Sequence, residues 1–181
     1  RARHFFILMF LMRGMPFVDL AHLEKSNLNQ GLLKYNRMKT GTPMSVEIID
    51  SAYELLSLLR NNHSSSCSDR PDYLFHILSG EYKRGEEGAY REYQSALRKF
   101  NNHLKSLSRK LRLHSSVTSY TLRHSWATTA KYRGVPIEMI SESLGHKSIK
   151  TTQIYLKGFE LEERTKVNKQ NYYYVRRFKI A

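Results

Sequence analysis

The segment YTLRHSWATTAKYRGVPIEMISESLGHKSIKTTQIY, residues 120–155, decides the fold that we expect for this chain. It is divided at Gly134 with Pro136, and again at Gly145 with Ser148. A glycine commonly ends a helix, and a proline or serine commonly begins the next one. The segment therefore predicts three short consecutive helices.

A long helix is predicted just before this segment. Apolar residues over 90–111 alternate at spacings of three and four, which indicates an amphipathic helix of about six turns. We expect its apolar stripe to be buried, and the stripe consists of Tyr90, Tyr93, Leu97, Phe100, Leu104, Leu107 and Leu111. Its other faces are rich in Lys and Arg and are either solvated or lie along a phosphate backbone.

The first 60 residues predict helices around a hairpin. Residues 3–24 have a helical pattern that should break near Gly14 and Pro16. Residues 32–38 and 44–49 flank a loop with Gly and Pro, as the strands of a β-hairpin do, and a helix to residue 60 follows. The expected fold class is mixed α/β, mostly helical with a small antiparallel β-sheet.

The charge of the chain indicates a polyanionic partner. The 181 residues include 30 Lys and Arg against 16 Asp and Glu, a formal net charge of +14. Residues 1–90 hold 11 basic and 10 acidic side chains, whereas residues 91–181 hold 19 and 6. A polyanion should therefore lie against the C-terminal half, although charge alone also fits a solvated basic surface.

Length and composition suggest one domain in a reducing compartment. A chain of 181 residues with 40% hydrophobic residues can bury one sizeable core. The single Cys67 excludes an internal disulfide, no Cys/His group has zinc-like spacing, and we expect a cytoplasmic protein without a metal. The apolar run 5–12 is far shorter than the ~20 residues that span a bilayer, so it predicts a core helix rather than a membrane partner.

Three polar residues of the opening segment stand in an informative order. His146 follows Arg123 by 23 residues, and Tyr155 follows His146 by nine. With the words LRHSWAT (122–128) and LGHKSIKTTQIYL (144–156), these intervals resemble the signature of the tyrosine recombinases, the phage-integrase family. The resemblance runs from Arg13 to about Lys157 and implies a DNA strand-exchange enzyme of the mobile-element integrase type.

The resemblance also implies a role for each site residue. Arg13 and Arg123 take the places of two arginines that bind the scissile phosphate, and an arginine fork suits two phosphate oxygens. Tyr155 takes the place of the nucleophile, which needs nearby positive charge because a phenol titrates near ~10. His146 matches the histidine that contacts the phosphate and assists proton handling, and Lys39 matches the hairpin lysine that protonates the leaving 5′ oxygen. No cofactor and no metal are implied.

One position departs from the commoner family pattern. The residue three places before Arg123 is Tyr120, where the family more often has histidine. A phenol can donate a hydrogen bond to a phosphate, but it is a poor proton acceptor at neutral pH. Tyr120 is thus a candidate donor to the phosphate rather than a general base, while we expect His124 and Trp126 to be buried structural neighbours of Arg123.

The resemblance further implies how the chain is organised and what it binds. Residues 1–158 would form the catalytic domain, and residues 159–181 a helix from near Phe159 and a tail that is exchanged between subunits. A helical core-binding domain, which family members carry ahead of the catalytic one, is expected outside this chain. The expected partners are double-stranded DNA, further copies in a tetramer on DNA, and accessory DNA-bending proteins, whereas the isolated domain should be a monomer.

Two other functions remain open at the level of sequence. Residues 135–156 fit a helix-turn-helix, so the protein could be a non-catalytic DNA-binding regulator. A type IB topoisomerase would use the same chemistry. A covalent tyrosine adduct separates the regulator from both enzymes, and recombinant products from two DNA sites separate the recombinase from the topoisomerase.

Overall fold

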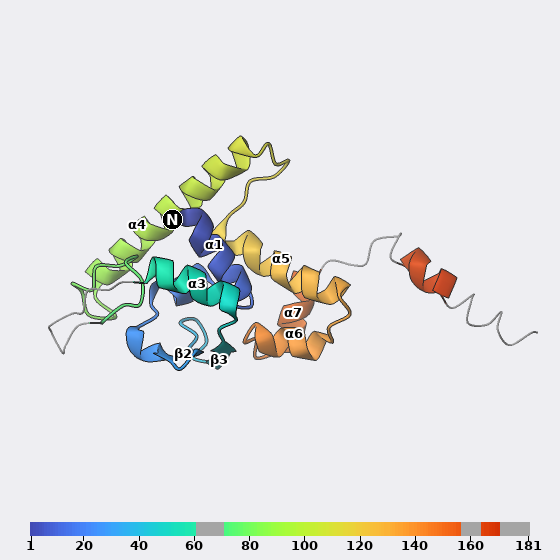
Figure 1. Cartoon of the computed structure of the whole chain (residues 1–181), viewed down its shortest axis with the longest axis horizontal. Helices are drawn as coiled ribbons and strands as arrows, with labels where there is room; N and C mark the ends of the chain where they lie inside the picture. The colour runs from blue at the N-terminus through green and yellow to red at the C-terminus, as the bar shows by residue number, and fades with distance from the viewer. Residues whose placement is uncertain (61–70, 157–163, 171–181) are drawn as a thin grey trace, which may run out of the picture.

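The computed structural model describes residues 1–60, 71–156 and 164–170, and is mostly helical with one small sheet, as predicted (Figure 1). Its α-helices are α1 (Ala2–Leu11), α2 (Phe17–Ala21), α3 (Asp50–Leu59), α4 (Glu87–Lys110), α5 (Ser119–Tyr132), α6 (Ile137–Ser143) and α7 (Ile149–Tyr155). The 3-10 helix η1 (Lys25–Asn27) leads into strands β1 (Leu28–Asn29), β2 (Leu32–Asn36) and β3 (Pro43–Glu47). Residues 164–170 are also helical.

The sheet is antiparallel in the order β1-β2-β3. Leu33 of β2 is opposite Val46 of β3, and both are buried, which fixes the face of the hairpin that meets the core. The predicted hairpin is therefore confirmed, with the loop at residues 37–42. The two-residue β1 was not predicted, because so short a strand has no alternating pattern.

The break between α1 and α2 is where the sequence predicts it. Gly14 has a φ of +68°, in the left-handed region that favours glycine, and Pro16 precedes the first residue of α2. A Cβ at Gly14 would lie 3.3 Å from the Cα of Arg123 and 3.2 Å from the Cβ of Trp126. The glycine thus lets this turn approach α5 closely.

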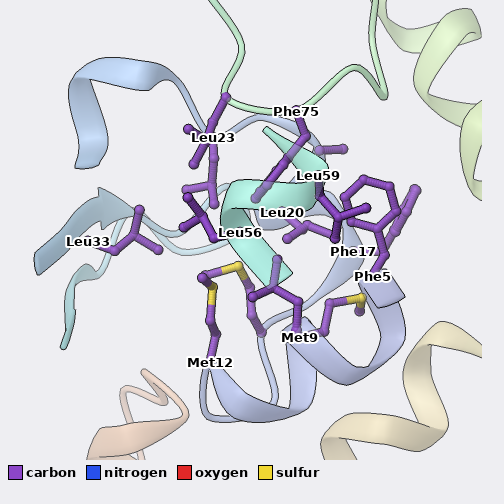
Figure 2. Close-up of a cluster of buried hydrophobic side chains, with 14 of the residues drawn as sticks. Phe5, Met9, Met12, Phe17, Leu20, Leu23, Leu33, Leu56, Leu59 and Phe75 are labelled. Carbon is purple, nitrogen blue, oxygen red and sulfur yellow. The ribbon is translucent and has the colours of Figure 1, made fainter. Parts of the chain in front are cut away.

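The main core is built around α1, which packs against α3, α4 and α5. Figure 2 shows how Phe5, Met9 and Met12 of this region meet Leu56 and Leu59 of α3. The ring of Phe17 stacks on that of Phe100 from α4, with centroids 4.5 Å apart. The apolar run 5–12 is accordingly a core helix, as predicted.

The buried stripe predicted for α4 is correct in the middle and wrong at both ends. Phe100 and Leu104 are buried, but Tyr90 and Leu111 are exposed. The periodicity of the apolar residues continues along the whole helix, whereas the core that covers them does not.

A second, smaller apolar cluster joins the last three helices. Ala127 of α5, Ile140 of α6 and Leu144 after α6 are buried in it, and Trp126 packs on it half-buried. Leu122 belongs instead to the main core. Arg123 therefore lies on α5 where the two clusters meet. Trp126 and His124 were expected to be buried, and the structure shows both half-buried, with Trp126 packed on the second cluster.

No helix among residues 1–60, 71–156 and 164–170 is both long and apolar enough to cross a bilayer. The predicted start of the last helix near Phe159, and most of the predicted tail, lie outside the described residues.

Candidate active site

Helix α5 presents Arg123 from a well-defined start. Thr118 is its N-cap, and the side chain of Thr118 accepts a hydrogen bond from the N–H of Thr121 at 3.4 Å. The hydroxyl of Thr121 accepts in return from the N–H of Thr118 at 3.1 Å, which completes a capping box. This start fixes the position of Arg123, the fifth residue of the helix.

Arg123 is only 4% exposed, and backbone carbonyls hold its guanidinium. Its Nη1 donates to the carbonyl of Gly14 at 3.1 Å, and its Nη2 donates to the carbonyl of Leu144. Nη2 also lies 3.1 Å from Nε2 of His146. A buried cation needs such partners, because desolvation without them is costly. Arg123 therefore joins the α1–α2 turn to the α6–α7 turn.

Arg13 lies in the same α1–α2 turn as the glycine that Arg123 binds. Its φ is +58°, in a region that residues other than glycine rarely adopt. Its Nη1 is 3.4 Å from the carbonyl of Ser45 in β3, to which it donates. Backbone strain of this kind persists only where the surroundings enforce it. The structure thus brings the side chain of Arg13 against the hairpin, while its neighbour Gly14 lies against α5.

His146 lies in a turn whose backbone is fixed by two hydrogen bonds to the end of α6. Gly145, with a φ of +64°, donates from its N–H to the carbonyl of Glu142 at 2.8 Å, and the N–H of His146 donates to the carbonyl of Ser141 at 3.0 Å. This pair of bonds is the Schellman arrangement that ends many helices. Ser148 then caps α7, since its hydroxyl accepts from the N–H of Lys150 at 3.3 Å.

The hydrogen bonds of His146 assign its tautomer. A guanidinium can only donate, so Nε2 of His146 accepts from Arg123. Nδ1 therefore carries the proton and donates to the hydroxyl of Thr152, 2.8 Å away and fully buried in α7. Burial, together with the positive charges of Arg123 and Arg37, lowers the pKa of His146 to about 4. The imidazole is thus neutral at pH 7 in the free protein.

Tyr155 is the last residue of α7, three positions after Thr152. Since Thr152 binds His146, the helix that carries the expected nucleophile is tied directly to the imidazole. The position of the Tyr155 side chain lies outside what the structure describes.

Lys39 is placed differently from the arginines. It is exposed in the hairpin loop, as predicted, and lines an open pocket of about 760 Å³ together with Val18, His22 and Tyr93. The free protein therefore holds Lys39 on the hairpin loop, at a pocket between α2 and α4.

Tyr120 is one helical turn before Arg123 and is 58% exposed. Its ring meets the edge of the His124 ring, with centroids 4.8 Å apart. Tyr120 is thus accessible to a ligand on the α5 surface, and its part in catalysis stays a prediction.

Three polar residues of this region were not singled out by sequence as parts of the site. Arg37 is only 8% exposed and donates from Nη1 to the carbonyls of Leu144 at 2.8 Å and Gly145 at 3.2 Å. Asp19, fully enclosed, accepts from Nε of Arg37 at 3.3 Å, and Thr152 binds His146 as described. A polar residue within an apolar pattern was the available signal for Asp19, whereas Arg37 looks like an ordinary hairpin cation.

A tyrosine near the arginines has the wrong chemistry for a nucleophile. Burial and the charge of Asp19 raise the pKa of Tyr35, on β2, well above its ordinary value. Its phenol therefore stays protonated.

In residues 1–60, 71–156 and 164–170, no group of His, Cys, Asp and Glu side chains is arranged to hold a metal ion.

Comparison with known proteins places this geometry in a family. The model of the phage integrase family matches residues 2–161. The chain is 31% identical over 137 residues to the probable integrase/recombinase protein MJ0367 of Methanocaldococcus jannaschii, covering 76% of this chain and 39% of that protein. It is 30% identical over 151 residues to tyrosine recombinase XerA of Pyrococcus furiosus, covering 82% of this chain and 48% of that one.

A solved structure has the same fold. The crystal structure of XerA recombinase superposes with a TM-score of 0.66 at 22% identity, over 94% of this chain and 58% of the other. The chain spans less than half the length of the two curated relatives named above.

Proposed function

This chain belongs to the phage integrase family, and on that premise we propose that it is the catalytic domain of a site-specific DNA recombinase. The enzyme would integrate, excise or invert DNA by cutting and rejoining strands through a 3′-phosphotyrosine. One observation carries the proposal. Nη2 of Arg123, on α5, lies 3.1 Å from Nε2 of His146 in the turn that precedes α7, and α7 ends at Tyr155.

The chemistry begins with attack on one phosphodiester. The phenol oxygen of Tyr155 forms a bond to phosphorus as the bond to the 5′ oxygen breaks. The phenol proton passes to solvent water, and Lys39 supplies a proton to the departing 5′ oxygen. The 5′ hydroxyl of another strand then attacks the phosphotyrosine, which reverses these steps and releases Tyr155. The ester conserves the energy of the phosphodiester, so no nucleotide cofactor is required.

The two arginines would stabilise the charge that develops on the non-bridging oxygens. The carbonyl partners of Arg123 hold its guanidinium in place before the phosphate binds, and only its contact with Nε2 of His146 would give way to the phosphate. A phosphate beside Nε2 of His146 would favour the imidazolium, because a nearby anion raises the pKa of a histidine. His146 would then become a donor to phosphate only when DNA is bound.

Assembly and location follow as further parts of the proposal. Double-stranded DNA fits the net charge of +14, and four copies on paired sites would complete the strand exchange, with accessory DNA-bending proteins where the sites require them. DNA as the substrate supports a cytoplasmic location. If the tail couples subunits, deletion after Gly158 should impair recombination between two sites more than binding to one. Equal impairment would contradict this role.

A nicked suicide duplex tests the proposed function. The protein produced from its complete gene should form a covalent complex with this DNA in EDTA, seen on a denaturing gel. Tyr155→Phe should abolish the complex and leave binding almost intact. A complex that persists in Tyr155→Phe, or is lost on adding chelator, would overturn the proposal. Sequencing of junctions from two native sites would then separate a recombinase from a topoisomerase.

A further inference from the structure

Arg37 makes contacts that an ordinary hairpin cation does not make. It follows the last residue of β2 and is 8% exposed, although its neighbours Asn36 and Met38 are exposed. Its N–H donates to the carbonyl of Thr42 at 2.9 Å, and its carbonyl accepts from the N–H of Gly41 at 2.8 Å. The backbone of Arg37 therefore closes the loop in which Lys39 lies.

The side chain of Arg37 bridges three separate segments. Asp19 of α2 accepts from Nε through Oδ2, and accepts from the N–H of Met38 through Oδ1 at 2.9 Å. On the other side, Nη1 donates to the carbonyls of Leu144 and Gly145. These carbonyls lie at the C-terminal end of α6, where the helix dipole is negative and a cation is favoured.

The same turn is bound from its other side by Arg123. The carbonyl of Leu144 accepts from both Arg37 and Arg123, so two arginines of different elements converge on one oxygen atom. Gly145 permits this contact, because a Cβ there would lie 2.7 Å from Cδ of Arg37 and 2.5 Å from Sδ of Met44. The hairpin and the turn thus meet without space between them.

We propose that Arg37 is a positioning residue that holds the hairpin carrying Lys39 and the turn carrying His146 in one rigid frame. Asp19 assists by pairing with the buried charge and by fixing the N–H one residue before Lys39. The base of the hairpin loop and the turn that carries His146 would then keep their relative position through the reaction, and only the side chain of Lys39 would move to reach the leaving oxygen. This inference rests on the proposed function and adds a residue to the same site.

A substrate with a 5′-bridging phosphorothiolate tests this role, because sulfur leaves without protonation. In the protein from its complete gene, Arg37→Lys should cut normal DNA roughly 10- to 100-fold more slowly, the loss expected when a catalytic group is displaced by about 1 Å. The phosphorothiolate should restore a large part of that loss, as it should for Lys39→Ala. Lys34→Met, which removes an exposed cation from the same hairpin, should cut both substrates at the normal rate.

The controls separate positioning from stability. Rates are divided by the folded fraction from thermal melting, and Asp19→Asn serves as a second variant that changes the partner of Arg37 instead of Arg37 itself. An equal loss on both substrates in Arg37→Lys and Asp19→Asn, or no loss in either, would overturn the inference. If the unaltered protein forms no covalent complex with either DNA, the proposed function fails instead.

Discussion

Substitution of Gly145 by alanine should show how closely the turn that carries His146 packs against the hairpin. The residue has a φ of +64°, and the added Cβ would lie 2.5 Å from Sδ of Met44 and 2.7 Å from Cδ of Arg37. Gly134→Ala is a matched control, since Gly134 has a φ of +78° and its Cβ would meet no atom of the described residues within 4 Å.

Both substitutions should lower the free energy of unfolding by the same backbone term, and only Gly145→Ala should add a term for overpacking. A left-handed residue other than glycine costs about 1–2 kcal/mol, and the less flexible unfolded chain returns about 0.4–1 kcal/mol. Gly134→Ala should therefore destabilise by about 1 kcal/mol. At Gly145, overpacking adds about 1–3 kcal/mol, so the total should reach about 2–4 kcal/mol. The excess measures the fit of the turn against Arg37 and Met44.

Urea unfolding of both variants, followed by circular dichroism, would measure these free energies. Unchanged slopes with respect to urea would show that the unfolded states are comparable. Equal destabilisation by the two substitutions would refute the close fit, and with it the reasoning that the hairpin and the turn move as one unit.

Further predictions concern the charged residues of the site. The pKa of His146 is lowered to about 4 in the folded protein, so between pH 6.5 and 4 the unfolded chain binds a proton at this residue and the folded chain does not. The free energy of unfolding should therefore fall with acidification across this window, and it should fall less in His146→Gln. Urea titrations at several pH values would measure both. Arg123→Ala and Arg13→Ala should each slow cleavage by roughly 10²–10³ with a modest loss of DNA affinity, and a loss of affinity as large as the loss of rate would contradict the assignment. Lys39→Ala should cut a 5′-bridging phosphorothiolate far better than normal DNA, and failure of this rescue would remove Lys39 as the general acid.

Much of the fold was predictable from local chemistry. The glycines at 14, 134 and 145 mark turns with positive φ, and the hairpin follows from a Gly and Pro loop between two strand patterns. The stripe of α4 was less predictable at Tyr90 and Leu111, because periodicity describes the helix and not the extent of the core that covers it.

The order and spacing of the candidate site residues could be read from the sequence, but their protonation and burial could not. The resemblance assigned Arg123 and His146 to one phosphate site, and in the structure Nη2 of Arg123 lies 3.1 Å from Nε2 of His146. Their catalytic roles stay a prediction. The resemblance could not reveal that His146 is neutral, since this depends on burial and on two arginines from distant segments. Nor could it reveal the burial of Arg37, whose carbonyl partners lie 107 and 108 positions further along the chain.

The most direct test of the central claim is to locate the protein–DNA bond. The protein should be reacted with a nicked suicide duplex, digested with protease and nuclease, and the nucleotide-bearing peptide sequenced by mass spectrometry. The account predicts a 3′-phosphate ester on Tyr155, the last residue of α7. An ester on Tyr35, or on one of Tyr172, Tyr173 and Tyr174, or an ester to the 5′ end of the DNA, would contradict it.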